Sequence, residues 1–259
     1  MARARFARRH SLPLAASALA AASFVASLAG CRVASSGGSV SGDTTPARAA
    51  SADRAATAAP ASGWRSLIDP SLGAWRGYKE QTLPAGWTVS DGTLTKAGVQ
   101  ADLISRDEFG DFELEFEWKI APGGNAGVFY RTSEEYEKVY WSGPEYQLLD
   151  DAGHPDGRNR LTSAGAAYGL YAPPAGVVRP ADQWNQTRLV VRGHHVEHWL
   201  NGQKVVEYEL ESPGWKALVK ASKFSEWPHY GLAPRGHIAL QGDHTGTLNM
   251  RNMRIRTLP

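Results

Sequence analysis

Residues Phe112 to Ile120 alternate strictly between apolar and charged side chains. Aromatic and aliphatic residues occupy every even position, and Glu or Lys occupies every odd one. Because side chains along a β-strand point to opposite faces with a period of two, this segment predicts a strand with one core face. The opposite face, which carries Glu113, Glu115 and Glu117, is predicted to be solvated, as is common in antiparallel sheets.

Short segments of similar pattern, separated by turn residues, continue to the C-terminus. Asn201-Gly202 is a strong hairpin signal, because a type I′ turn requires positive φ at both central positions. Only one helix is predicted, at 215–224, after the N-cap and first-turn proline Ser212-Pro213. Many short strands with such punctuation predict an all-β fold, a two-sheet sandwich or jelly roll with one short helix. The predicted strands are 93–94, 112–120, 127–131, 146–149, 188–192, 195–200, 205–208, 237–241 and 247–256.

The first 31 residues have the organisation of a secretory signal. Four arginines between Arg3 and Arg9 precede an apolar run from Leu12 to Leu28 that is too short to be a lasting membrane span. The sequence Leu28-Ala29-Gly30-Cys31 then resembles the lipobox of bacterial lipoproteins, and Cys31 is the one cysteine of the chain. We therefore expect an acylated Cys31 that anchors the protein to a lipid bilayer of the bacterial cell envelope, facing the periplasm or the surface.

Residues 32–62 consist of Ala, Ser, Gly, Thr and Pro with scattered charges, which predicts a flexible tether. Residues 63–259 are then a single domain. The formal charge of +2 is misleading, because seven of the 28 Lys and Arg lie in residues 1–60, against two of the 26 acids. The remainder carries a charge of −3, so no nucleic-acid partner is expected.

Uncompensated polar residues gather between Pro122 and Asp151. Asn125, Arg131, Glu145, Gln147 and the pair Asp150-Asp151 lie on or beside two β-patterned segments. In the second segment, Gly143–Asp150, Tyr146 and Leu148 share one side of the strand, and Glu145 and Gln147 share the other. Such a polar face, set between aromatic residues, is typical of proteins that bind or cleave sugars. Two structural alternatives stay open: an ion pair for Arg131 and a turn at Asp150-Asp151.

Several motifs in a fixed order resemble the 3-keto-disaccharide hydrolase family. They include PGGNAGVFYR and GPEYQLLDD, the Gly86-Trp87 and Asp91–Leu94 segments, His198–Gly202, Ser222–Phe224, and Gly236–Gln241 followed by Asp243-His244. The resemblance covers nearly all of the domain and implies a concanavalin-like jelly roll that acts on oxidised glycosides. The chain departs from the family pattern at Gly242, which is inserted after Gln241, and at Thr245 before Gly246.

The resemblance also implies a chemistry. A ketone at C3 of a sugar acidifies the C2 proton, so a base can form an enolate that expels the C1 substituent, and water then adds to complete the hydrolysis. Glu145 or His244 would be the base, and Arg131 or a divalent metal ion would hold the enolate oxygen. Asp151 and Asp243 are the candidate metal ligands. The candidate substrate-binding residues are Gln147, Asn125, Asp150, Tyr168, Trp227 and Gln241.

Two alternatives from other functional classes remain. A non-catalytic carbohydrate-binding module could share the fold, since the same sandwich hosts lectins and enzymes. An envelope interaction protein would leave these polar residues scattered over separate faces. Convergence of the polar residues in one pocket, with a titratable group among them, would favour an enzyme.

Overall fold

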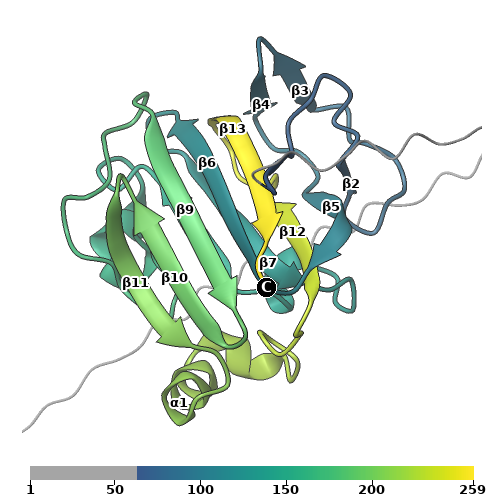
Figure 1. Cartoon of the computed structure of the whole chain (residues 1–259). Helices are drawn as coiled ribbons and strands as arrows, with labels where there is room; N and C mark the ends of the chain where they lie inside the picture. The colour runs from purple at the N-terminus through teal and green to yellow at the C-terminus, as the bar shows by residue number, and fades with distance from the viewer. Residues whose placement is uncertain (1–62) are drawn as a thin grey trace, which may run out of the picture. The chain divides into compact units, whose positions relative to one another are not determined.

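The computed structural model describes residues 63–259, and these residues form two antiparallel β-sheets packed face to face (Figure 1). The strands of the eight-stranded sheet, in spatial order, are β11 (Gln203–Glu209), β10 (His195–Leu200), β9 (Asn185–Arg192), β6 (Phe112–Ile120), β13 (Thr247–Thr257), β4 (Thr93–Ala97) and β3 (Trp87–Ser90), with β1 (Arg65–Ser66) beside β13. The strands of the five-stranded sheet are β2 (Trp75–Gly77), β5 (Leu103–Phe109), β12 (Gly236–Leu240), β7 (Asn125–Thr132) and β8 (Glu145–Leu149). The predicted two-sheet, jelly-roll-type sandwich is confirmed.

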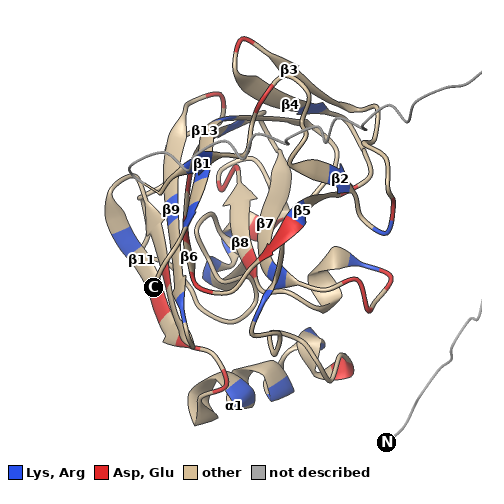
Figure 2. Ribbon diagram, turned by 45° about the vertical axis from the view of Figure 1, so that its right-hand side comes forward, with Lys and Arg blue, Asp and Glu red and all other residues tan. Residues whose placement is uncertain are grey.

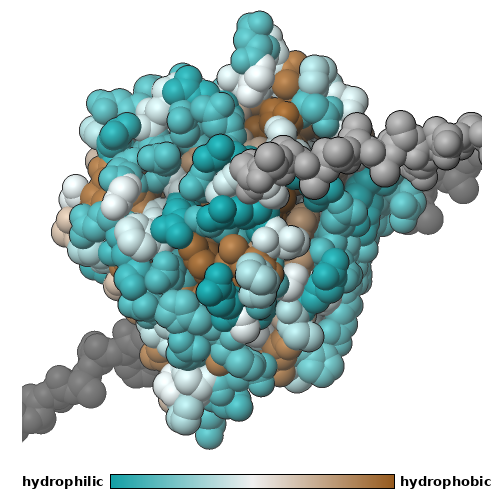
Figure 3. Space-filling view, in the orientation of Figure 1, coloured by the Kyte–Doolittle hydropathy of each residue, from teal (hydrophilic) through white to brown (hydrophobic). Residues whose placement is uncertain are grey.

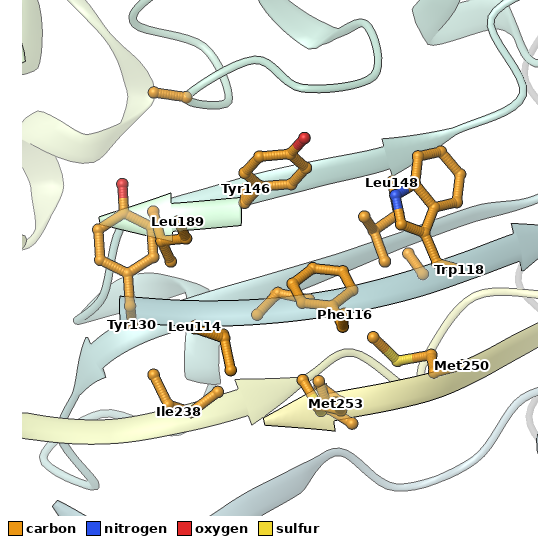
Figure 4. Packing of buried hydrophobic residues seen from close by; sticks show 14 of the residues in the cluster. Leu114, Phe116, Trp118, Tyr130, Tyr146, Leu148, Leu189, Ile238, Met250 and Met253 are labelled. Carbon is orange, nitrogen blue, oxygen red and sulfur yellow. The ribbon is translucent and has the colours of Figure 1, made fainter. Parts of the chain in front are cut away.

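The main hydrophobic core lies between the two sheets (Figure 4). The even-numbered residues of β6 are at most 3 % exposed, as their alternation predicts. From the other sheet, Tyr146 and Leu148 of β8 point into the same core, and the Phe116 and Tyr146 rings meet edge to face at 6.3 Å. The opposite side chains of β8, including Glu145 and Gln147, therefore lie on the outer face of the five-stranded sheet.

The glutamates of β6 were predicted to face solvent. In the structure they form ion pairs on the outer face of the eight-stranded sheet. Each glutamate lies opposite an arginine of β13: Glu113 pairs with Arg256, Glu115 with Arg254, and Glu117 with Arg251. Arg188 of β9 also binds Glu113, whose carboxylate is buried as a result. The surface viewed in Figure 3 is mostly hydrophilic around a small hydrophobic patch.

The predicted turn and helix are both present. Asn201 and Gly202 have φ values of 50° and 84°, as a type I′ turn requires. Helix α1 (Pro213–Ala221) begins earlier than predicted, with Ser212 accepting a hydrogen bond from the Trp215 amide at its N-terminus. It lies at one end of the two sheets (Figure 2) and ends before the 3₁₀ helix η4 (Lys223–Glu226), because Ser222 caps both helices.

Three further 3₁₀ helices lie in the loops on either side of β8: η1 (Val139–Trp141), η2 (Pro155–Arg158) and η3 (Arg160–Thr162). No helix within residues 63–259 is long and apolar enough to cross a membrane. The predicted signal peptide, lipobox Cys31 and tether lie outside the described residues, so acylation, membrane attachment and localisation stay predictions.

Candidate functional site

The candidate site is built around Gly127 on the outer face of the five-stranded sheet. Gln147 of β8 lies opposite Gly127 in the strand register. On the other side of β7, the backbone amide of Gln241 donates to the Gly127 carbonyl oxygen at 3.0 Å. Gly127 leaves open the space that a side chain would fill, and Glu145 extends into it. A Cβ atom at position 127 would lie only 2.1 Å from Glu145 Oε1. The glycine is therefore required for the position of this carboxyl group.

A pocket of about 210 Å³ opens above this part of the sheet. Since ligand pockets commonly span ~300–1,000 Å³, this one suits a small ligand or a single ring of a larger one. Most of its wall is polar, and it combines residues of β7, β8 and four separate loops. The lining residues are Asn125, Tyr140, Glu145, Asp156, Tyr168, Lys223, Gln241, Asp243 and His244.

Among the side chains that line the pocket, Glu145 has the pKa that departs furthest from its ordinary value. Burial raises the pKa of its carboxyl group from 4.5 to about 8. The Lys223 ammonium opposes this effect, whereas Asp243, Asp156 and Asp102 reinforce it by repelling the ionised form. No group within residues 63–259 donates a hydrogen bond that would stabilise the Glu145 carboxylate, so burial dominates. A carboxyl group with a pKa close to physiological pH is suited to exchange a proton with a ligand.

Several buried oxygens of this site have no hydrogen-bond partner among the described residues. They are Asn125 Oδ1, Gln241 Oε1 and Asp243 Oδ1 in the pocket wall, together with Gln147 Oε1 beside it. A buried polar atom without a partner costs roughly 1–3 kcal/mol, so natural proteins retain such atoms mainly where a ligand or water satisfies them. Their clustering around Glu145 indicates a ligand rich in hydroxyl groups.

The loop that departs from the family pattern is held firmly against the sheet. The Gly242 amide donates to Asp102 Oδ1 at 2.7 Å, and Lys96 Nζ donates to the His244 carbonyl oxygen at 2.7 Å. A side chain at Gly242 would collide with the backbone of Ala101, so the inserted glycine permits this close approach. The loop thereby places Asp243 and His244 in the pocket wall, where burial lowers the pKa of His244.

Six of the residues predicted from the sequence line this pocket: Glu145, His244, Asn125, Tyr168, Gln241 and Asp243. Arg131 does not, and its predicted contact with an enolate oxygen in this pocket does not fit its position. A β-bulge places both Tyr130 and Arg131 opposite Ile238, and Arg131 has a φ of 51°. The bulge breaks the alternation, so the Arg131 guanidinium instead donates to the Gly110 carbonyl oxygen and lies 3.2 Å from Asp111.

Three acidic or amide candidates have structural contacts instead. Asp150 Oδ1 accepts a hydrogen bond from the Ala152 amide at 3.2 Å, within the turn predicted as its alternative role, and Asp150 Oδ2 accepts one from the Gly123 amide at 2.8 Å. Asp151 Oδ1 accepts one from the Ala164 amide at 2.8 Å, outside the pocket wall. Gln147 Nε2 donates to the Thr162 carbonyl oxygen at 3.2 Å, so Gln147 supports the loop behind the pocket.

The predicted sugar platform at Trp227 is also displaced. Its ring stacks on Trp141 with a centroid separation of 5.0 Å and packs against Phe224. It lines an apolar groove beside helix α1 rather than the polar pocket. Tyr168 is the aromatic candidate whose ring does reach the pocket wall.

The predicted metal ligands Asp151 and Asp243 are not brought together. Within residues 63–259 the group of side chains with metal-ligand spacing is His195, Glu197 and Glu207, on the outer face of the eight-stranded sheet. Lys204 Nζ already lies 3.3 Å from Glu197 and 2.7 Å from Glu207, so an internal cation neutralises these carboxylates.

Three pocket residues were not predicted from the sequence: Tyr140, Asp156 and Lys223. Lys223 lies in the Ser222–Phe224 segment that supports the family resemblance, and this was the one signal that could have identified it. Tyr140 and Asp156 belong to short 3₁₀ helices with no periodic pattern, so their positions follow only from the folded loops.

A larger pocket of about 440 Å³ lies on the opposite side of the sandwich, where Trp64 and the bulge of β13 meet β6. Its acidic residues Glu115 and Glu117 are engaged by Arg254 and Arg251. None of its residues has a buried side-chain atom lacking a partner among the described residues. Size alone favours this pocket, but the chemistry favours the smaller one around Glu145.

Comparison with known proteins gives the family of the chain. The sequence profile of the 3-keto-alpha-glucoside-1,2-lyase-like domain matches residues 63–256. A 3-keto-disaccharide hydrolase of Bacteroides thetaiotaomicron is 32 % identical over 244 residues, which cover 82 % of this chain and 84 % of that protein.

Solved structures of two proposed glycosyl hydrolases from Parabacteroides distasonis are similar to this chain. The first has a TM-score of 0.72 and 29 % identity, covering 77 % of this chain and 95 % of that one. The second has a TM-score of 0.60 and 27 % identity, covering 75 % and 99 %. With the profile match spanning almost all of the described residues, the chain belongs to the 3-keto-alpha-glucoside-1,2-lyase-like family.

Proposed function

We propose that this protein is a glycosidase-like enzyme that cleaves 3-keto-glycosides by elimination across C1–C2 of the oxidised sugar, followed by hydration. Family membership and the named relative support a hydrolase that acts on carbohydrate. The observation that carries the proposal is Glu145, a buried carboxyl group with a pKa of about 8, which lies amid polar atoms that have no hydrogen-bond partner among the described residues. A plain binding module needs the hydrogen-bonding groups but not this tuned acidity.

The proposed first step is a proton transfer from carbon. Ionised Glu145 takes the proton from C2, the C2–H electron pair forms a C2=C3 double bond, and the ketone π electrons move to the C3 oxygen as an enolate. The enolate then reforms the ketone, the double bond shifts to C1=C2, and the C1–O bond breaks. A pKa near 8 makes the Glu145 carboxylate a stronger base than an ordinary glutamate while a useful fraction stays ionised at neutral pH.

The leaving oxygen needs a proton, and we assign that step to His244. Burial lowers the pKa of His244, which makes its protonated form a stronger acid. Water then adds across the double bond, with hydroxide at C1 and a proton at C2, so that the sum of the steps is hydrolysis. This route does not use the paired carboxylates of ordinary glycosidases.

The remaining pocket residues would bind the sugar ring. Asn125 and Gln241 offer buried amide groups, and either end of an amide can hydrogen-bond a hydroxyl group. Tyr168 presents an aromatic ring on the same wall, suited to stack against the C–H bonds of a sugar. The small volume of the pocket favours recognition of one oxidised ring, with the leaving group toward the opening.

The test is cleavage of a 3-keto-α-glucoside with a chromogenic leaving group, alongside its unoxidised parent. Glu145→Gln should lower the rate by ~10²–10⁴-fold, as loss of a general base commonly does. Glu226→Gln, at an exposed position outside the pocket, is the matched control. In D₂O, elimination and hydration place deuterium at C2 of the product, whereas direct hydrolysis retains the original hydrogen. Wild-type turnover by Glu145→Gln would overturn the proposal, and binding without turnover by the wild type would favour a binding module.

We also propose that the enzyme is lipid-anchored in the bacterial cell envelope through acylated Cys31. The support is the order of basic, apolar and small residues that ends at Leu28-Ala29-Gly30-Cys31.

A further inference from the structure

Lys223 occupies a position that the surrounding fold fixes from several sides. It is the first residue of η4, where Ser222 Oγ accepts a hydrogen bond from the Phe224 amide at 3.1 Å. Phe224 stacks on Tyr230 with a centroid separation of 4.1 Å, and Tyr230 continues into a stack with Trp215 of α1. This packing holds the backbone at Lys223 beside the pocket.

The ammonium group of Lys223 is held by aromatic rings and not by a carboxylate. Its Nζ lies 4.5 Å from the centroid of the Tyr168 ring and 5.3 Å from that of Phe224. None of the ion pairs within residues 63–259 involves Lys223. Contact with ring faces orients the cation and leaves its three N–H donors available to a ligand.

Among the residues that the structure describes, Lys223 is the one lysine or arginine that lines the pocket. Lys96 donates to the His244 carbonyl oxygen, and Arg131 donates to Gly110 and Asp111, so neither is free to face a ligand here. Among the charged groups that change the pKa of Glu145, Lys223 has the largest effect, and it lowers that pKa. The pocket therefore pairs one base with one cation.

We propose that Lys223 is a catalytic residue that binds the C3 ketone oxygen of the sugar and stabilises the enolate formed when Glu145 removes the C2 proton. This inference rests on the proposed function. C2 and C3 are bonded neighbours, so the base and the cation must approach from within the same small pocket, as Glu145 and Lys223 do. The electron pair released from the C2–H bond ends on the C3 oxygen, where the ammonium group offsets the new negative charge.

The experiment isolates this step by removing the leaving group. In D₂O, 3-keto-1,5-anhydroglucitol has no aglycone to lose, so enolisation appears only as exchange of the C2 hydrogen for deuterium, followed by NMR. Lys223→Met keeps the length of the side chain and removes its charge, and should lower the exchange rate by about 10²–10³-fold. Lys223→Arg keeps a cation and should exchange faster than Lys223→Met. Lys220→Met, at an exposed position of α1 outside the pocket, is the matched control and should exchange at the wild-type rate.

Two further readouts separate a catalytic role from a structural one. For cleavage of a 3-keto-α-glucoside, Lys223→Met should lower kcat much more than it raises KM, with unchanged thermal melting. It should also move the acid limb of the kcat/KM profile to higher pH, because the positive neighbour that lowers the pKa of Glu145 is lost.

The outcomes distinguish this inference from the proposed function. Wild-type exchange by Lys223→Met, with exchange lost in Glu145→Gln, would overturn the role of Lys223 and leave the elimination chemistry standing. Equal loss in Lys223→Met and Lys223→Arg would overturn the electrostatic role, because it would make the amine itself essential. Absence of both exchange and cleavage in the wild type would overturn both proposals.

Discussion

Replacing Glu145 by glutamine should stabilise the protein at high pH and leave its stability unchanged at low pH. In the folded state the pKa of Glu145 is raised from 4.5 to about 8 by burial. Between these pH values the folded protein keeps the proton while the unfolded chain has released it. The free energy of unfolding of the wild type therefore falls as pH rises through this window and levels off above about pH 8.

The magnitude follows from the two pKa values. The rise in pKa from 4.5 to about 8 lowers the free energy of unfolding by ~5 kcal/mol once Glu145 is ionised in both the folded and the unfolded state. At pH 7 the same pKa difference lowers it by ~3 kcal/mol. Glutamine cannot ionise, so Glu145→Gln avoids this loss, while below pH 4.5 it resembles the protonated wild type in charge and shape. The variant should thus equal the wild type at pH 4 and exceed it progressively up to pH 9.

Urea denaturation of both proteins at pH 4, 7 and 9 measures this difference. Other titrating groups contribute equally to both proteins and cancel in the comparison. Glu226→Gln is the control for the loss of one carboxylate from an exposed position. A stability difference that does not change with pH would refute the reasoning, because it would show that Glu145 ionises equally easily in the folded and unfolded states.

Other perturbations follow from the same geometry. Asp243→Asn removes a negative charge that raises the pKa of Glu145, so the acid limb of the kcat/KM profile for cleavage should move to lower pH; an unmoved limb would contradict the proximity of the two groups. Gly127→Ala should lower the cleavage rate by about 10²-fold, because its Cβ would lie 2.1 Å from Oε1, 2.8 Å from Cδ and 2.9 Å from Cγ of Glu145 and would displace the carboxyl group. Unaltered kinetics would show that the carboxyl group acts from elsewhere. Cys31→Ser should abolish incorporation of labelled fatty acid, and labelling at the wild-type level would disprove the lipoprotein prediction.

The fold was predictable where one face of a strand is buried and the other is polar. The two predicted ranges 112–120 and 195–200 coincide with β6 and β10, because both strands belong to a sheet whose outer face carries charged residues. β5 was missed because it begins with buried Leu103-Ile104 and continues into three exposed charged residues. β7 (Asn125–Thr132) was predicted only as 127–131, because it is buried at all eight positions and its sequence does not alternate between apolar and polar residues.

The site was predictable only in part, for similar reasons. Glu145 was identified because it alternates with the core residue Tyr146 in a single short strand. Arg131 was misplaced because the bulge opposite Ile238 depends on β12, a strand distant in sequence. Lys223 reaches the pocket through the packing of Phe224 on Tyr230, which no local pattern reveals.

Glu113 and Glu145 show why residue type alone does not identify a functional carboxylate. Both are buried glutamates on the outer face of a sheet, and both alternate with aromatic core residues. Arg188 and Arg256 on the two flanking strands bind Glu113, and these contacts hold its pKa below the ordinary value despite burial. Glu145 has Gly127 and Phe129 beside it on β7 and receives no hydrogen bond within the described residues, so burial raises its pKa instead. The partners supplied by neighbouring strands thus decide whether a buried glutamate stabilises the sheet or remains available to accept a proton from a substrate.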